Sequence, residues 1–173
     1  MANIHKDRLI DFTVFVEGER KLGTADVTLP TLSYQTETLS GAGIAGEMET
    51  PALGHTESSE VEINWRTVNS DLFELFEPRS HSLEFRGANQ YYDAGNGELK
   101  VVPVAVFVKA LPKETDMGSM ESNSTSDSTT TMECTYIKVV IDGVTKLEID
   151  KPNYVHKVNG KDYAADIRSA LGL

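Results

Sequence analysis

The chain has 173 residues, of which 39% are hydrophobic, enough for a globular domain with a buried core. Its 27 acidic residues outnumber 16 basic ones and give a formal net charge of −11, which argues against a surface that holds nucleic acid through phosphate contacts. No apolar run reaches membrane-spanning length, and the single cysteine, Cys134, excludes an intrachain disulfide.

The N-terminal part alternates apolar and polar residues, which is the pattern of half-buried strands. It predicts a strand around residues 12–16, a turn, and a return strand over residues 21–29. Pro30 breaks this run, and a further strand is predicted over residues 31–39.

The glycines between positions 41 and 46 then spell G-x-G-x-x-G. In dinucleotide-binding proteins this string joins a strand to a helix whose N-terminus holds the pyrophosphate. Here Pro51 and Gly54 interrupt any helix that follows, and two glutamates would lie beside the phosphates. We therefore interpret residues 39–58 as a long, permissive loop used for turns or for packing against a partner.

Residues 60–67 alternate most clearly and predict a half-buried strand with Trp65 in the core or at an interface. Asp71 and Glu74 have the spacing of a capping box, so a short helix is predicted there, ending at Pro78. Its leucines and phenylalanines lie at i, i+3 and i+4 and predict docking against the sheet.

Turn residues divide the C-terminal half, where Asp142-Gly143 is a strong hairpin signal. Pro103 marks an edge, a bulge or a bend within its strand. Residues 112–131, rich in Ser and Thr from Met117, are predicted to be a mobile loop. A short helix with Asp162 as its cap and Gly172 as its stop ends the chain. The strands are predicted over residues 82–92, 99–111, 132–141, 144–149 and 154–158.

The sequence shows no catalytic pattern. The four histidines are widely spaced and form no H-E-x-x-H pair, and Cys134 lies in an alternating strand, which favours a structural role. Glu60 and Glu62 share one face of a strand, where a solvated face is favoured over a catalytic pair. We therefore expect no catalytic residue, no cofactor, no metal site and no enzymatic activity.

The order of segments resembles that of the major tail tube proteins of contractile-tailed phages. Residues 12–54 are similar to the N-terminal half of that family, residues 102–118 to its long strand and following loop, and residues 136–173 to its C-terminal part. The matching N-terminal residues are Val27-Thr28-Leu29-Pro30, Leu32, Glu37, Gly41 and Gly43. The chain departs from the family at Ser40, where a basic residue is common, and in the Ser/Thr tract.

The resemblance implies one domain over residues 1–173, a mainly β fold. It would be a β-sandwich or half-barrel of antiparallel strands with one flanking helix and a short C-terminal helix. It also implies hexameric rings stacked into the hollow inner tube of a contractile tail, the conduit for genome delivery through the bacterial envelope. The implied place is the virion tail, assembled in the host cytoplasm, in keeping with a start that lacks a signal-peptide core.

The implied partners are further copies, the tail sheath protein, a tape-measure protein in the lumen, and baseplate and tail-terminator proteins. DNA would pass without specific binding, as the acidic excess favours, and no stable membrane binding is implied. We expect the loop from Leu39 onward to contact an adjacent subunit or ring. The candidate interface residues are Leu39, Gly41, Gly43, Ile44 and Met48, with Leu171 and Leu173 as a second, C-terminal pair.

Three alternatives remain at this point. The same tube can belong to a DNA-free phage-tail-like bacteriocin. The chain can instead be a small β-barrel ligand-binding module, with Trp65, Tyr91 and Tyr92 as the pocket aromatics. The glycine string keeps a dinucleotide-dependent enzyme as the third alternative.

Overall fold

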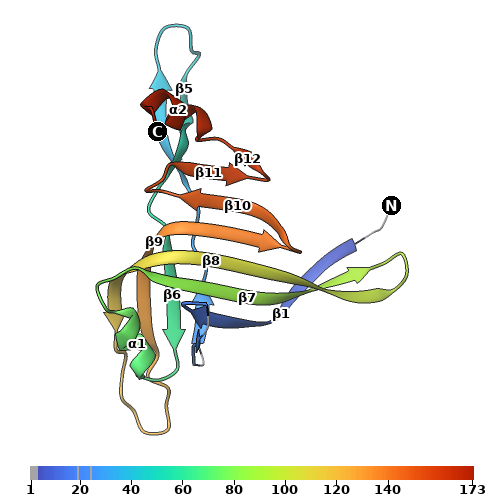
Figure 1. Cartoon of the computed structure of the whole chain (residues 1–173), viewed down its shortest axis with the longest axis vertical. Coiled ribbons are helices and arrows are strands. Elements are labelled where there is room, and N and C mark those ends of the chain that lie inside the picture. Colours follow the sequence, from blue (N-terminus) through green and yellow to red (C-terminus); the bar gives the residue numbers. More distant parts are fainter. Residues whose placement is uncertain (1–3, 19, 24) are drawn as a thin grey trace.

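A computed structural model describes residues 4–18, 20–23 and 25–173, most of which lie in antiparallel strands (Figure 1). The expected mainly β architecture with one flanking helix and a short C-terminal helix is confirmed. The strands are β1 (Ile4–Val16), β2 (Arg20–Lys21), β3 (Ala25–Thr28), β4 (Tyr34–Ser40), β5 (Glu47–Thr56), β6 (Glu60–Trp65), β7 (His81–Asp93), β8 (Glu98–Asp116), β9 (Ser128–Ile141), β10 (Val144–Asp150), β11 (Val155–Val158) and β12 (Lys161–Asp162). The helices are α1 (Ser70–Leu75) and α2 (Ala165–Leu171).

The main sheet divides at β9. One edge of β9 pairs with β8, while on the other edge its first half pairs with β6 and its second half with β10. The path runs β12-β11-β10-β9-β8-β7-β1-β2, and β3 attaches to β6. Because the two halves of β9 hold different neighbours, the sheet bends around this strand into a half-barrel that stays open between β1 and β3.

The core fills the inside of this half-barrel. Trp65 is only 1% exposed, and its indole Nε1 donates a hydrogen bond to Thr130 Oγ1 over 3.0 Å. The other members of this core cluster come from the inner faces of the strands, from α1 and from Leu22, which follows β2: Val14, Val16, Leu22, Val61, Ile63, Leu72, Leu75, Leu83, Phe85, Val106, Val108, Ala110, Met132, Cys134 and Ile137. Of the two roles predicted for Trp65, the core is the one the structure shows.

Both predicted long loops contain strand residues, so their predicted bounds are wrong. Within residues 39–58, residues 39–40 and 47–56 belong to the two strands of a hairpin, and the turn between Ser40 and Glu47 and residues 57–58 lie outside the strands. Pro51 and Gly54 lie inside β5, which tolerates them because β4 is its only partner in the described chain. Likewise β8 continues to Asp116 and β9 begins at Ser128, which leaves a shorter loop between them.

The return strand predicted over residues 21–29 is divided. Its start, β2, pairs with β1, and its end, β3, pairs with β6 on the other side of the barrel opening. The predicted hairpin at Asp142-Gly143 is confirmed, and a second one forms at Asn159-Gly160; in both turns the two residues have positive φ. Pro103 lies just before the first β8 residue paired with β9, Val104, which agrees with an edge position.

Both helices exist, but their caps differ from the prediction. Asn69 caps α1 and accepts a hydrogen bond from the Leu72 amide, so Asp71 lies in the first turn instead. The leucines of α1 are buried, whereas Phe73 and Phe76 are about half exposed. In α2 the predicted stop at Gly172 is confirmed, while the N-cap is residue 164 and not Asp162. No helix in the described ranges is long and apolar enough to cross a membrane.

Candidate assembly surfaces

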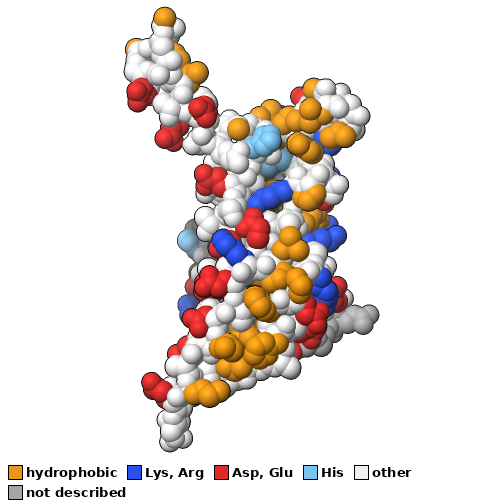
Figure 2. All heavy atoms as spheres, turned by 90° about the vertical axis from the view of Figure 1, so that its left-hand side faces the viewer, with side chains coloured by type: hydrophobic (Ala, Val, Ile, Leu, Met, Phe, Trp, Pro, Cys, Tyr) orange, Lys and Arg blue, Asp and Glu red, His pale blue; other side chains and the backbone are white. Residues whose placement is uncertain are grey.

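The hairpin of β4 and β5, which we call the arm, forms a sheet of its own and stands away from the half-barrel (Figure 2). Every residue of β4 is exposed, and most residues of β5 are exposed along the outer part of the arm. A two-stranded hairpin alone is at best marginally stable in water. An arm of this kind is therefore a surface that another protein can cover.

The register of the arm gives it two different faces. Leu39 lies directly opposite Met48, and both side chains are about half exposed, so one face carries an apolar pair. Residues 47, 49 and 51 alternate with Met48 and place Glu47 and Glu49 on the other face. The sequence-predicted interface residues Leu39 and Met48 are thus neighbours in space.

The glycine string forms the turn at the end of the arm. Gly41 and Gly43 have φ values of 141° and 97°, which side chains other than glycine rarely adopt, so the turn requires glycine there. The Ile44 amide donates to the Gly41 carbonyl over 3.1 Å and closes the turn. Because strand β5 follows where a dinucleotide site needs a helix, the structure excludes the phosphate-binding interpretation.

The root of the arm is held by the C-terminal part of the chain. The Tyr34 hydroxyl lies 3.1 Å from Nε2 of His156 on β11, and the two rings are 5.4 Å apart. Burial lowers the pKa of His156, and the nearby Asp162 carboxylate opposes this effect. His156 Nδ1 is buried and has no hydrogen-bond partner among the described residues. The environment of the ring therefore disfavours its protonation.

Helix α2 packs against the other strand at the same root. A Cβ placed on Gly54 would lie 3.2 Å from Cδ1 of Ile167, so strand and helix are in close contact. Arg168 pairs with Asp162 at 2.7 Å and donates to the carbonyl of Tyr154, which holds α2 to β12 and to the residue before β11. The hydrogen bond from Arg168 lowers the pKa of Asp162, against a smaller effect of burial.

The two C-terminal interface candidates lie beside this root. Leu171 and Leu173 are 57% and 74% exposed, so they do not cap the core. The structure thus groups Leu39, Gly41, Gly43, Ile44 and Met48 at the far part of the arm, and places the C-terminal pair apart from them, where the arm joins the body (Figure 1).

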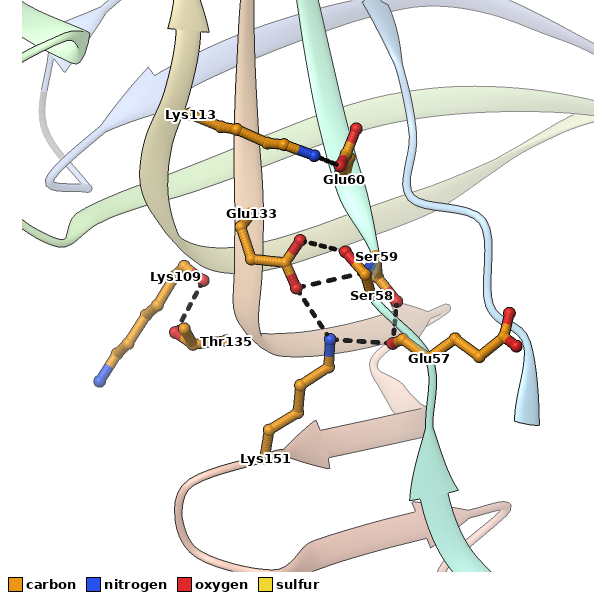
Figure 3. A network of polar contacts seen from close by, with 9 residues as sticks. All are labelled: Glu57, Ser58, Ser59, Glu60, Lys109, Lys113, Glu133, Thr135 and Lys151. Atoms are coloured by element: carbon orange, nitrogen blue, oxygen red, sulfur yellow. Dashed lines mark hydrogen bonds and ion pairs between the residues drawn. The ribbon is translucent and has the colours of Figure 1, made fainter. Parts of the chain in front are cut away.

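A polar network fixes the segment through which β5 leads into β6 (Figure 3). Glu133 accepts hydrogen bonds from the Ser58 hydroxyl, the Ser59 amide and the Lys151 ammonium group, at 2.5, 3.4 and 3.2 Å. Partial burial raises the pKa of Glu133, but these bonds outweigh it and lower the pKa overall. Lys151 also donates to the carbonyl of Glu57 over 3.0 Å, which ties the segment to the end of β10.

The residues of the alternative predictions have other roles. Glu60 pairs with Lys113, and this hydrogen bond raises the pKa of Lys113, as in a surface ion pair. Cys134 is fully buried, and its burial raises the thiol pKa to about 12, which agrees with a structural role. Trp65 is in the core, whereas Tyr92 is 40% exposed and stacked on His5, so the ligand-pocket aromatics are not brought together.

Comparison with known proteins identifies the class. A model of the family "Phage tail tube protein FII" matches residues 6–172, so this is a structural protein of a phage tail and not an enzyme. The chain belongs to the phage tail tube protein FII family. Proteins of this kind are components of the virion tail, and the predicted resemblance is confirmed.

Individual relatives agree with this assignment. The chain is 30% identical over 178 residues to the tail tube protein of Escherichia phage P2, covering 100% of both chains. It is 27% identical over 164 residues to the major tail tube protein of Serratia phage KSP20, covering 94% of each. The sheath/tube terminator of an extracellular contractile injection system is similar in fold, with a TM-score of 0.55 and 16% identity over 79% of this chain and 96% of that one.

Proposed function

We propose that this chain assembles into hexameric rings that stack into the hollow inner tube of a contractile phage tail, through which the genome enters the bacterium. The family match over residues 6–172 carries the proposal. In this assembly residues 1–173 act as one tube domain, formed in the host cytoplasm before it becomes part of the virion. The surrounding sheath, a tape-measure protein in the lumen, and the baseplate and terminator proteins are the further partners.

Tube assembly requires an exposed element that can contact a neighbouring subunit, and the arm is such an element. Rings that stack without closing on themselves need contacts between different surfaces of identical subunits. Leu39, Ile44 and Met48 supply an apolar surface at the end of the arm, and Gly41 and Gly43 allow its turn. We place these five residues in a contact with a neighbouring subunit or ring, and Leu171 and Leu173 in a secondary contact at the root.

Electron microscopy of the purified, concentrated protein tests the proposal. We expect rings or tubes for the natural chain, and only unassembled subunits when residues 39–48 are replaced by a two-residue turn. The shortened chain should keep its cooperative unfolding transition, because the arm adds no side chain to the main core cluster. A natural chain that stays monomeric at high concentration, or a shortened chain that still forms tubes, would contradict the proposal.

A further inference from the structure

The outer face of the main sheet, opposite the core, carries rows of charged residues across the strands. One row runs directly from strand to strand in the order Glu84, Phe107, Lys138, Glu148 and Lys157. In the next row Lys109 lies opposite Tyr136. Side chains that lie in one row across a sheet are neighbours on the same face. A charged side chain in such a row can therefore pair with the residue opposite it on the next strand.

Two lysines on this face have no carboxylate partner in the described chain. The other cations are paired: Arg86 with Glu84 at 2.6 Å and Lys157 with Glu148 at 3.3 Å. The ammonium groups of Lys109 and Lys138 lie instead over the rings of Tyr136 and Phe107, at 5.7 and 5.9 Å from the ring centres. Figure 3 shows the Lys109 side chain pointing away from the Glu133 network.

These two lysines border a groove. It has a volume of about 310 Å³, and its lining includes Phe107, Tyr136 and Glu84. The Glu84 carboxylate is already paired with Arg86, so it does not neutralise the two lysines. The groove thus combines aromatic surface with two positive charges that lack a partner. An acidic strand that carries a small apolar residue is the kind of ligand that fits this combination.

The arm has the complementary features. Residues 34–56 contain three glutamates and neither lysine nor arginine. Glu47 and Glu49 lie exposed on one face of β5 and have no ion-pair partner within the described ranges. Pro51 follows on the same face, and its ring can pack on an aromatic side chain.

The spacing of the charges also agrees. Two residues apart on one strand, Glu47 and Glu49 have Cα atoms about 7 Å apart. Lys109 and Lys138 are one strand and two residues apart, which separates their Cα atoms by about 8 Å. Because lysine side chains are long and flexible, their ammonium groups can reach the two carboxylates despite this difference in Cα separation.

We propose that the Glu47–Glu49 face of the arm of one copy docks in the Lys109–Lys138 groove of a second copy. The two carboxylates pair with the two ammonium groups, and Pro51 packs against the aromatic rings. This inference rests on the proposed tube assembly and names the surface that receives the arm. It leaves the apolar Leu39–Met48 face free to contact a third subunit, so both faces of the arm become covered.

Charge reversal on each side tests the pairing. The variants Glu47→Lys with Glu49→Lys, and Lys109→Glu with Lys138→Glu, should each lower the tube yield at least about tenfold, because like charges then meet. Combining all four changes in one chain should restore tubes, since the pairs form again with opposite signs. Thermal unfolding of the unassembled variants checks that each chain folds.

The matched control uses Lys6 and Lys146, two exposed lysines outside the groove. Lys6→Glu with Lys146→Glu changes the net charge equally and should leave the yield close to that of the natural chain. Added to the Glu47→Lys and Glu49→Lys pair, it should fail to restore tubes.

The outcomes separate the two proposals. If the natural chain forms no tube, the proposed function fails. If it forms tubes while the Lys109 and Lys138 variant assembles normally, the docking inference is overturned and the function stands. Rescue by the Lys6 and Lys146 control, or no rescue by the four-site variant, also overturns the inference.

Discussion

The Tyr34 hydroxyl lies 3.1 Å from Nε2 of His156, although 122 residues separate the two in the chain. This contact joins the first residue of the arm to β11, while Gly54 on the returning strand packs against α2. Both strands of the arm are thus held at the root by the C-terminal segment. The arm can project into solvent because its base is fixed on both sides.

Replacing Tyr34 with phenylalanine should lower the free energy of unfolding by about 1 kcal/mol, because the ring stays while Nε2 of the buried His156 loses its partner. Urea denaturation measures this change. Tyr154→Phe is the control: its hydroxyl is in no hydrogen bond between described residues, so the change should stay within about 0.5 kcal/mol. Equal effects of the two variants would contradict the assigned role of the contact.

Stability should also depend on pH through His156. Burial lowers its pKa in the folded chain below the ordinary value of 6.5, so the unfolded chain binds a proton first as the pH falls. The free energy of unfolding should therefore decrease as the pH drops below 6.5 and through the lower folded pKa. His156→Gln should flatten this dependence between about pH 7 and pH 5; an unchanged slope would show that another group causes it.

Glu133 and Asp162 should act at lower pH. Their folded pKa values lie below the ordinary values of 4.5 and 3.8, so their stabilising effect is present above those values and is lost as the pH falls through the folded ones. Acid unfolding followed by circular dichroism should occur at a higher pH in Glu133→Gln than in the natural chain. Glu121→Gln, which lies in the loop after β8, is the control and should leave the midpoint unchanged.

Elements with a local signal could be predicted from the sequence. The alternation over β6 and the Asp142-Gly143 turn depend on neighbouring residues only, and both are confirmed. In the arm, β4 largely coincides with the strand predicted over residues 31–39. The return strand β5 could not be predicted, because Pro51 and Gly54 usually end regular structure and are tolerated here only in a strand with a free edge. The grouping of Leu39 with Met48 depends on that same register.

Long-range contacts had no sequence signal. Tyr34 and His156 meet only because the beginnings of β4 and β11 lie side by side in the fold. The row that holds Lys138 depends on pairing between five strands. The Ser/Thr tract illustrates the same limit. Its composition favours a loop, yet Thr130 lies in β9 and bonds to the buried Trp65.

The hydrogen bond between Trp65 and Thr130 can be tested by substitution. Thr130→Val keeps the shape of the side chain but leaves the buried indole N–H without an acceptor, so it should cost about 1–3 kcal/mol of unfolding free energy. Thr129→Val, which points to the opposite face of β9, should change stability by less than about 0.5 kcal/mol. If both substitutions have the same effect in urea denaturation, the hydrogen bond does not contribute as proposed.

The natural thiol should not react in the folded protein. Cys134 is fully buried and its pKa is raised to about 12, so a thiol reagent at neutral pH should label it only after denaturation. Leu39→Cys then supplies a single reactive site on the arm. It should react rapidly in the unassembled subunit and slowly in tubes, whereas Leu99→Cys, on the exposed end of β8, shows whether tube formation slows labelling everywhere.

The contact between the arm and α2 can be measured with two glycines that share a backbone conformation. Gly54 and Gly97 have φ values of 71° and 73°, so alanine causes similar backbone strain at both positions. At Gly97 nothing lies within 4 Å of the added Cβ, while at Gly54 it meets Ile167 and Ala164 at 3.2 and 3.4 Å. Gly54→Ala should therefore destabilise the protein by about 1 kcal/mol more than Gly97→Ala and speed amide hydrogen exchange in α2. Equal losses, with exchange in α2 unchanged, would show that the helix does not hold the root of the arm.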